Sequence, residues 1–177
     1  MENCHREDEV VSSFASVDPQ WDSDYFSIMS ANSTKGKCAV QILDKFGNHI
    51  VNATGDYTKK NAIFRVYQGV DNIGRIVVMF ECLSEQPHGW MLAVDDNGKL
   101  TTRKRKVEYK NFSQGEPDVV FIYHRVDYKH GNVMFYSEKA KGFVGFDTNG
   151  DPMSLKEVPK YSKAADLYLE QSKLPSS

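Results

Sequence analysis

The chain has 177 residues, of which 40% are hydrophobic and 12% aromatic, so it can build one domain with a buried core. Its longest apolar run, Ile76–Phe80, is far too short to cross a bilayer, which excludes a membrane-spanning protein of the helical class. The first residues, MENCHREDEVVSS, lack the basic start and apolar core of a secretory signal peptide. We therefore expect a protein made in the cytosol and not inserted into a membrane.

Charge is distributed unevenly along the chain. Residues 1–24 carry seven acidic side chains and one basic one, a net charge of −6, whereas the rest carries 21 bases and 17 acids, a net charge of +4. An acidic arm therefore precedes a basic body. The arm can be a plain solvated tail, or it can mask a basic surface until it is removed.

Residues 1–36 show neither a helical nor a strand period and are rich in turn-forming residues, which predicts a mostly disordered or loosely packed segment. From Lys37 onward, short β-branched and aromatic runs alternate with turn residues, and this pattern indicates an all-β domain. The predicted strands are CAVQIL (38–43), HIVNAT (49–54), AIFRVY (62–67), RIVVMFECL (75–83), GWMLAV (89–94), VVFIYHRV (119–126), NVMFYS (132–137), GFVGF (142–146) and ADLYLE (165–170).

An internal repeat refines the fold prediction. An apolar residue, Asp, two further residues and Gly recur at 43–47, 94–98 and 146–150, so the glycines are 51 and 52 residues apart. Gly suits the positive φ of a tight hairpin, and Asp can hydrogen-bond the local backbone. Three repeats of about 50 residues predict a β-trefoil of three four-stranded units, with a propeller or a sandwich as the alternative. The strands that follow the three turns are centred on Phe64, Phe121 and Leu167.

No motif in the sequence points to catalysis, a cofactor or a metal. The five histidines have no ligand spacing and accompany no nucleophile motif, so each is interpreted as a surface or strand residue. Residues 147–151 faintly resemble a calcium loop but lack its frame and its terminal Glu, and a hairpin turn explains them better. We expect a protein that is not an enzyme.

The sequence contains one dense basic cluster, within a stretch (101–118) that is interpreted as a loop inserted in the middle repeat. No aromatic platform accompanies it and the whole chain is slightly acidic, so nucleic acid is not favoured. An acidic protein partner is the preferred interpretation, and a solvated loop is the alternative. The candidate binding residues are Arg103, Lys104, Arg105 and Lys106.

The last third of the chain carries a resemblance to a known family. Val119–Tyr123, Asn132–Glu138 and Lys141–Val144 resemble the interleukin-1 family, in which a Phe-rich strand leads to a Phe-Glu-Ser hairpin and a Gly-aromatic strand. Here Tyr136 stands in place of that Glu. The ending 165–171 is similar to the closing strand of the family. The pattern extends over most of residues 37–171, although its motifs are specific only in the last third.

One branch of that family has precursors with an N-terminal piece of about this size and a processing site that ends in Ser-Asp-Tyr-Phe, as in residues 23–26 here. The resemblance implies a cytoplasmic precursor, cut by an inflammatory caspase and released without a leader, that binds an Ig-domain receptor outside the cell. Residues 1–24 would be the propeptide arm and residues 25–177 the mature domain. The predicted cleavage-site residues are Trp21, Asp22, Ser23, Asp24 and Tyr25.

The side chains suit such a cut after Asp24. An arginine-lined protease pocket accepts a carboxylate, and an aromatic pocket would take Trp21, three residues upstream. Asp18 is a poorer site because Pro19 follows it and lacks an N–H. Trp21 could instead pack the arm onto the barrel.

Other ligand classes stay open at this point. Residues 62–64 and 93–100 are similar to the fibroblast growth factors, which are also trefoils. The heparin-binding turn of that family should be basic, whereas residues 147–151 contain no base, so a polyanion would be repelled there. A growth-factor-like ligand with little heparin binding, a receptor antagonist and a sugar-binding trefoil remain alternatives. We expect a monomer.

Overall fold

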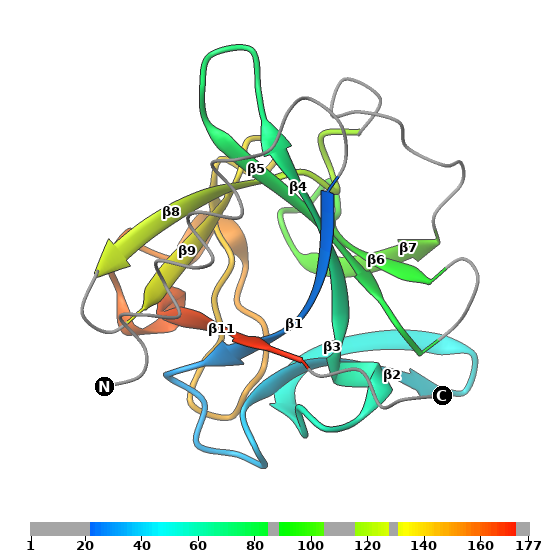
Figure 1. Ribbon diagram of the computed structural model, residues 1–177. Helices are drawn as coiled ribbons and strands as arrows, with labels where there is room; N and C mark the ends of the chain where they lie inside the picture. The colour runs from blue at the N-terminus through cyan, green and yellow to red at the C-terminus, as the bar shows by residue number, and fades with distance from the viewer. Residues whose placement is uncertain (1–21, 85–88, 105–115, 128–130, 173–177) are drawn as a thin grey trace.

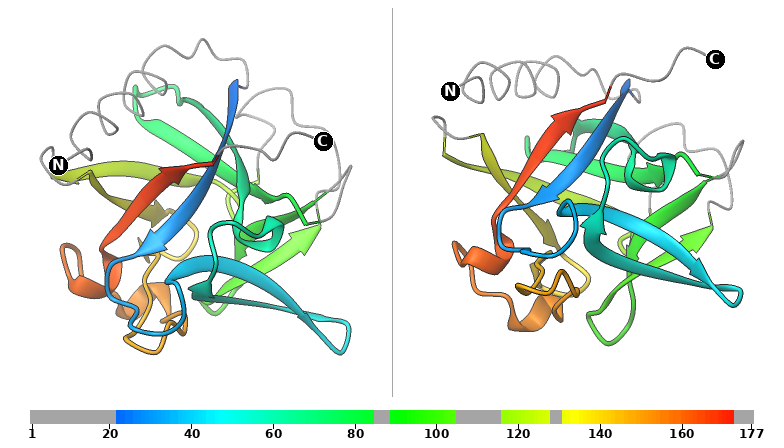
Figure 2. Two further views of the ribbon diagram at one scale, coloured as in Figure 1. Left: turned by 60° about the horizontal axis from the view of Figure 1, so that its bottom comes forward. Right: turned by 90° about the horizontal axis from the view of Figure 1, so that it is seen from below.

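The computed structural model describes residues 22–84, 89–104, 116–127 and 131–172, which form an all-β fold (Figures 1 and 2). None of the helices in these ranges is long and apolar enough to span a membrane. The strands are β1 (Asp22–Ser30), β2 (Ala39–Lys45), β3 (Asn48–Gly55), β4 (Phe64–Val70), β5 (Ile76–Cys82), β6 (Trp90–Val94), β7 (Leu100–Lys104), β8 (Phe121–Asp127), β9 (Asn132–Ser137), β10 (Gly142–Phe143) and β11 (Leu167–Gln171). Short 3₁₀ turns lie at η1 (Lys60–Ala62), η3 (Leu155–Glu157) and η4 (Lys163–Ala165).

Six antiparallel strands close into a barrel. β1 pairs with β4, β4 with β5, β5 with β8, β8 with β9, β9 with β11, and β11 returns to β1. Figure 1 shows β1 in blue beside β11 in red, where the two ends of the ring meet. The hairpins β2–β3 and β6–β7 and the short strand β10 lie outside the ring. A closed barrel is neither a propeller nor a sandwich, so the all-β prediction is confirmed and these two alternatives are wrong.

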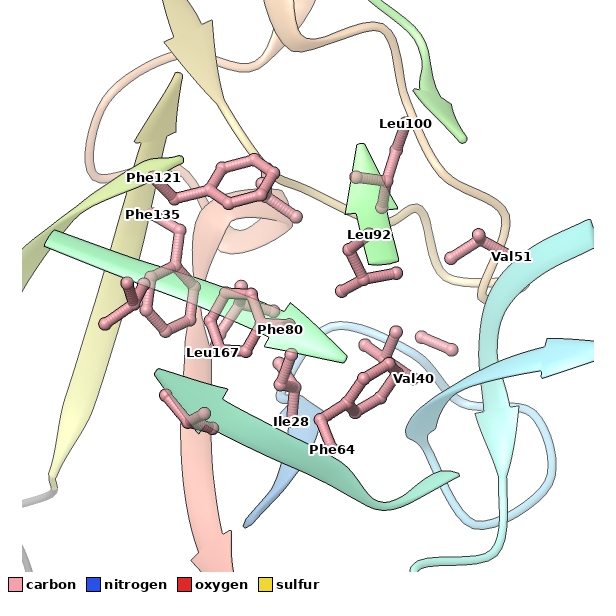
Figure 3. Close-up of a cluster of buried hydrophobic side chains, with 14 of the residues drawn as sticks. Ile28, Val40, Val51, Phe64, Phe80, Leu92, Leu100, Phe121, Phe135 and Leu167 are labelled. Carbon is pink, nitrogen blue, oxygen red and sulfur yellow. The ribbon is translucent and has the colours of Figure 1, made fainter. Parts of the chain in front are cut away.

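Each of the nine predicted runs overlaps a strand in the structure, because β-branched and aromatic side chains suit the half-buried surface of a sheet. The strand centres Phe64, Phe121 and Leu167 all lie in one buried cluster inside the barrel (Figure 3). None of the three side chains is more than 1% exposed. The core is therefore the meeting point of barrel strands that are far apart in the sequence.

The prediction that residues 1–36 are loosely packed is wrong for β1. Phe26 and Ile28 point into the main core, while Met29 packs in a second cluster. Between them, Ser27 is 1% exposed, and its hydroxyl donates a 2.7 Å hydrogen bond to the Ala62 carbonyl. The serines of this segment indicated a loop, but a hydrogen bond to distant backbone allows Ser27 to be buried in a strand.

The Asp-x-x-Gly turns form as predicted, but they do not by themselves define a repeat. In the turns that begin at Asp95 and Asp147, the Asp side chain accepts hydrogen bonds from the backbone N–H groups two and four residues later. The turn that begins at Asp71, inside the β4–β5 hairpin, has the same bonds. The turn at Asp44 differs, because Phe46 and Gly47 both have positive φ. The pattern therefore marks a kind of turn that also occurs between the proposed repeats.

Candidate functional site

The predicted cleavage site lies at the start of β1. The backbone of Asp22, Ser23, Asp24 and Tyr25 pairs with β4, where the partners are Gln68, Tyr67, Val66 and Arg65 in that order. Trp21 lies outside the described residues, as do the residues of the predicted arm that precede it. The bond between Asp24 and Tyr25 is therefore part of a two-stranded ladder at the end of the barrel.

Tyr25 is the first residue with a described side chain, and it is anchored from two directions. The Arg65 Nη2 atom donates a 2.6 Å hydrogen bond to the Tyr25 hydroxyl, and the guanidinium carbon lies 5.3 Å from the centre of the Tyr25 ring. On the other side, the Ser172 N–H donates a 2.8 Å bond to the Tyr25 carbonyl. Phe26, the next residue, is 3% exposed. The chain thus becomes fixed to the barrel at the residue that would follow the cut.

Arg65 is in turn held by a buried polar network. Its Nη1 atom lies 3.5 Å from the Tyr67 hydroxyl, and that hydroxyl donates a 2.8 Å hydrogen bond to Glu81 Oε1. Glu81 is 2% exposed and also accepts a bond from the Gly89 N–H. Desolvation alone lowers the pKa of Arg65, but the hydrogen bonds with Tyr67 and Tyr25 outweigh it and the net pKa is raised. The guanidinium is therefore permanently charged beside Tyr25.

Sequence reasoning missed this network. Its signal was present, because Arg65 and Glu81 are charged residues inside otherwise apolar runs. They lie directly opposite each other in the β4–β5 ladder, a register that the two runs alone do not reveal. A buried charged side chain needs a polar or oppositely charged partner. Each of these two residues therefore predicted a partner in a neighbouring strand.

Gln68 is a second feature at this end of β4. It lies opposite Asp22 and is 1% exposed, and neither polar atom of its side-chain amide has a hydrogen-bond partner within the described part of the chain. Burying an amide without partners is unfavourable by about 1–3 kcal/mol. The β4 residue opposite Asp22 therefore lowers the stability of the pairing at the start of β1.

The basic cluster is divided by the structure. Arg103 and Lys104 belong to strand β7, which corrects their assignment to an inserted loop, and Arg105 and Lys106 lie outside the described residues. Arg103 makes a two-pronged ion pair with Asp118, with Nε–Oδ2 and Nη2–Oδ1 distances of 2.6 and 3.2 Å. Its side chain is only 17% exposed. Arg103 therefore joins strand β7 to the segment that contains Asp118.

Lys104 has a different environment, although it is the next residue. Its side chain is exposed, and its Nζ atom lies 6.0 Å from the centre of the Trp90 ring. On β3, His49 lies against the same indole, with the ring centroids 3.8 Å apart. Lys104, Trp90 and His49 therefore form a surface group of one cation and two aromatic rings, and we call it the Trp90 group.

Substitutions of Arg103 and Lys104 are expected to have different effects on the free energy of unfolding. Arg103→Ala should lower the free energy of unfolding by about 2 kcal/mol, because it leaves the half-buried Asp118 carboxylate without its guanidinium. Lys104→Ala should change it by less than about 0.5 kcal/mol, as is usual for an exposed residue. Urea unfolding followed by fluorescence measures both. Equal stability of the two variants would contradict the structural role of Arg103.

The described residues contain no group of three or more His, Cys, Asp or Glu side chains that could hold a metal ion. His124 packs against the rings of Tyr136 and Phe143, which also contact each other, and His49 is in the Trp90 group. In comparisons with known proteins, no family model matches the chain and no curated protein matches it.

Proposed function

We propose that the chain is a cytokine precursor of the interleukin-1 family, similar to interleukin-18. In this proposal a caspase-type protease cuts after Asp24, and the remaining domain binds an Ig-domain receptor and signals. One observation carries the proposal. The Ser-Asp-Tyr-Phe motif at residues 23–26 is located where the chain enters the barrel, so a cut after Asp24 removes the acidic arm and leaves Tyr25 and Phe26 anchored.

The arrangement of strands supports a β-trefoil. Each of the pairs β1 and β4, β5 and β8 belongs to the barrel and encloses one hairpin outside it, β2–β3 and β6–β7 respectively. In the third unit, β9 and β11 enclose β10 and an isolated bridge between Phe146 and Pro152. Three units of two barrel strands and one peripheral hairpin are the plan that the family resemblance implies.

Charge supports processing as the activating step. A cut after Asp24 removes a net charge of −6 and leaves a domain with a net charge of +4. A basic ligand associates faster with an acidic receptor surface, since complementary charge mainly raises the association rate. In this proposal the precursor is a cytoplasmic monomer, and the processed domain acts outside the cell after unconventional release. No cofactor takes part.

The proposal is tested with a reporter cell line that carries Ig-domain receptors of the interleukin-1 class. Purified chain is applied before and after treatment with an inflammatory caspase, and chain treated with inactivated caspase is the control. We expect a signal from the cut chain alone, and N-terminal sequencing of the product should begin at Tyr25. Binding of the cut chain without a signal would indicate an antagonist. Signalling through growth-factor receptors instead would favour the fibroblast-growth-factor-like alternative.

A further inference from the structure

The proposed cleavage site is closed by the pairing of β1 with β4. A protease binds its substrate as an extended strand and pairs with its backbone. The backbone of residues 22–26 already pairs with Phe64–Gln68 of β4, and the Tyr25 carbonyl accepts a bond from Ser172 on the other side. Protease and barrel compete for the same backbone groups, so the end of β1 must separate from β4 before the bond after Asp24 can be cut.

The Tyr25–Arg65 contact is a described side-chain interaction that opposes this separation. It combines a 2.6 Å hydrogen bond from a charged donor with the placement of the guanidinium over the ring, and both interactions are favourable. Arg65 is not free to follow Tyr25 outward, because Tyr67 holds it and the buried Glu81 holds Tyr67. Opening the strand therefore breaks the Tyr25–Arg65 contact.

We propose that Arg65 is a positioning residue that controls processing, because its contact with Tyr25 keeps the Asp24–Tyr25 bond paired and inaccessible. This inference depends on the proposed function for the identity of the cut.

It also accounts for release of the product. After the cut, only the pairs made by Asp22, Ser23 and Asp24 would hold the described end of the arm to β4, and so short a pairing is not stable alone. Phe26 keeps the new start of the domain in place.

The experiment uses the full chain and three variants. Arg65→Met removes the charged donor, and Arg65→Lys keeps the charge but loses the planar group that lies over the ring. Arg75→Met is the matched control, because Arg75 forms ion pairs with Asp71 and Glu138 that involve no residue of β1. Two quantities are measured for each protein: the rate of caspase cleavage after Asp24, and the hydrogen-exchange rates of the Asp24 and Phe26 amides, which alternate with Tyr25 and so face β4.

We expect Arg65→Met to be cut about tenfold faster than the original chain and its Asp24 and Phe26 amides to exchange about tenfold faster, the factor for one lost bond to a charged group. Arg65→Lys should lie between the two, and Arg75→Met should match the original chain. Unchanged cleavage and exchange in Arg65→Met would overturn the inference. So would unprotected Asp24 and Phe26 amides in the original chain, a measurement that does not depend on whether any variant folds.

The two proposals fail in different ways. If the caspase cuts neither the original chain nor Arg65→Met after Asp24, the proposed processing is wrong. The amide exchange rates of the same proteins still decide whether Arg65 holds the end of β1. If every protein is cut at one rate, processing stands and the role of Arg65 is wrong.

Discussion

Phe80→Ala is expected to lower the free energy of unfolding by about 3–5 kcal/mol, the usual cost of truncating a fully buried phenylalanine. Phe80 is 1% exposed, and its ring centroid lies 5.0 Å from that of Phe135 and 5.9 Å from that of Phe121. The ring of Phe64 follows at 6.4 Å. These neighbours come from three other strands of the closed barrel (Figure 3), so they cannot all move inward to fill the cavity.

Thermal unfolding measures this loss. For a chain of this length each kcal/mol shifts the Tm by about 2–4 °C, so a fall of roughly 10 °C is expected. Phe46→Ala is the matched control, since Phe46 is a fully exposed phenylalanine at the tip of the β2–β3 hairpin. It should change the free energy of unfolding by less than about 0.5 kcal/mol. Similar losses for the two variants would show that Phe80 does not have the central place in the core that the structure gives it.

Most strands from residue 38 onward could be predicted because each is a compact apolar run between turn residues, whereas β7 (Leu100–Lys104) was missed because only its first residue is apolar. β1 could not, because its partners β4 and β11 are about 40 and 140 residues away along the chain. Only that pairing gives Ser27 an acceptor and places Phe26 in the core. Closure of the barrel likewise depends on which strands pair and in what register, and the sequence of a single strand does not show this.

The candidate site could also be predicted only in part, because some of its residues are adjacent in the sequence and others are brought together by strand pairing. The motif around Asp24 is continuous in the sequence, and so it could be found there. The contacts that hold it, from Arg65 through Tyr67 to Glu81, exist only after β1, β4 and β5 align. In the basic cluster, Arg103 and Lys104 are neighbours in the chain but point to opposite faces of β7. Asp118, 15 residues after Arg103, forms an ion pair with Arg103, so Arg103 has a structural role that the sequence around it does not show.

Asp24→Ala is expected to slow caspase cleavage at this position by roughly 10³-fold or more, because a pocket built to bind a carboxylate rejects a side chain that lacks one. The fold should be unaffected, because the anchoring of β1 begins at Tyr25 and Phe26. The variant should therefore remain a full-length folded chain that gives no reporter signal after caspase treatment. The measurement is the rate of appearance of a product that begins at Tyr25.

Asp18→Ala is the control within the same acidic arm, since it removes the same charge from a position that Pro19 makes a poor site. If removal of charge alone were activating, the two variants would behave alike. If cleavage after Asp24 activates, Asp18→Ala should be processed and signal like the original chain, while Asp24→Ala should do neither. A variant at Asp24 that is still cut and still signals would mean that the functional boundary lies elsewhere in the chain. Tyr25 and its contact with Arg65 would then have only a structural role.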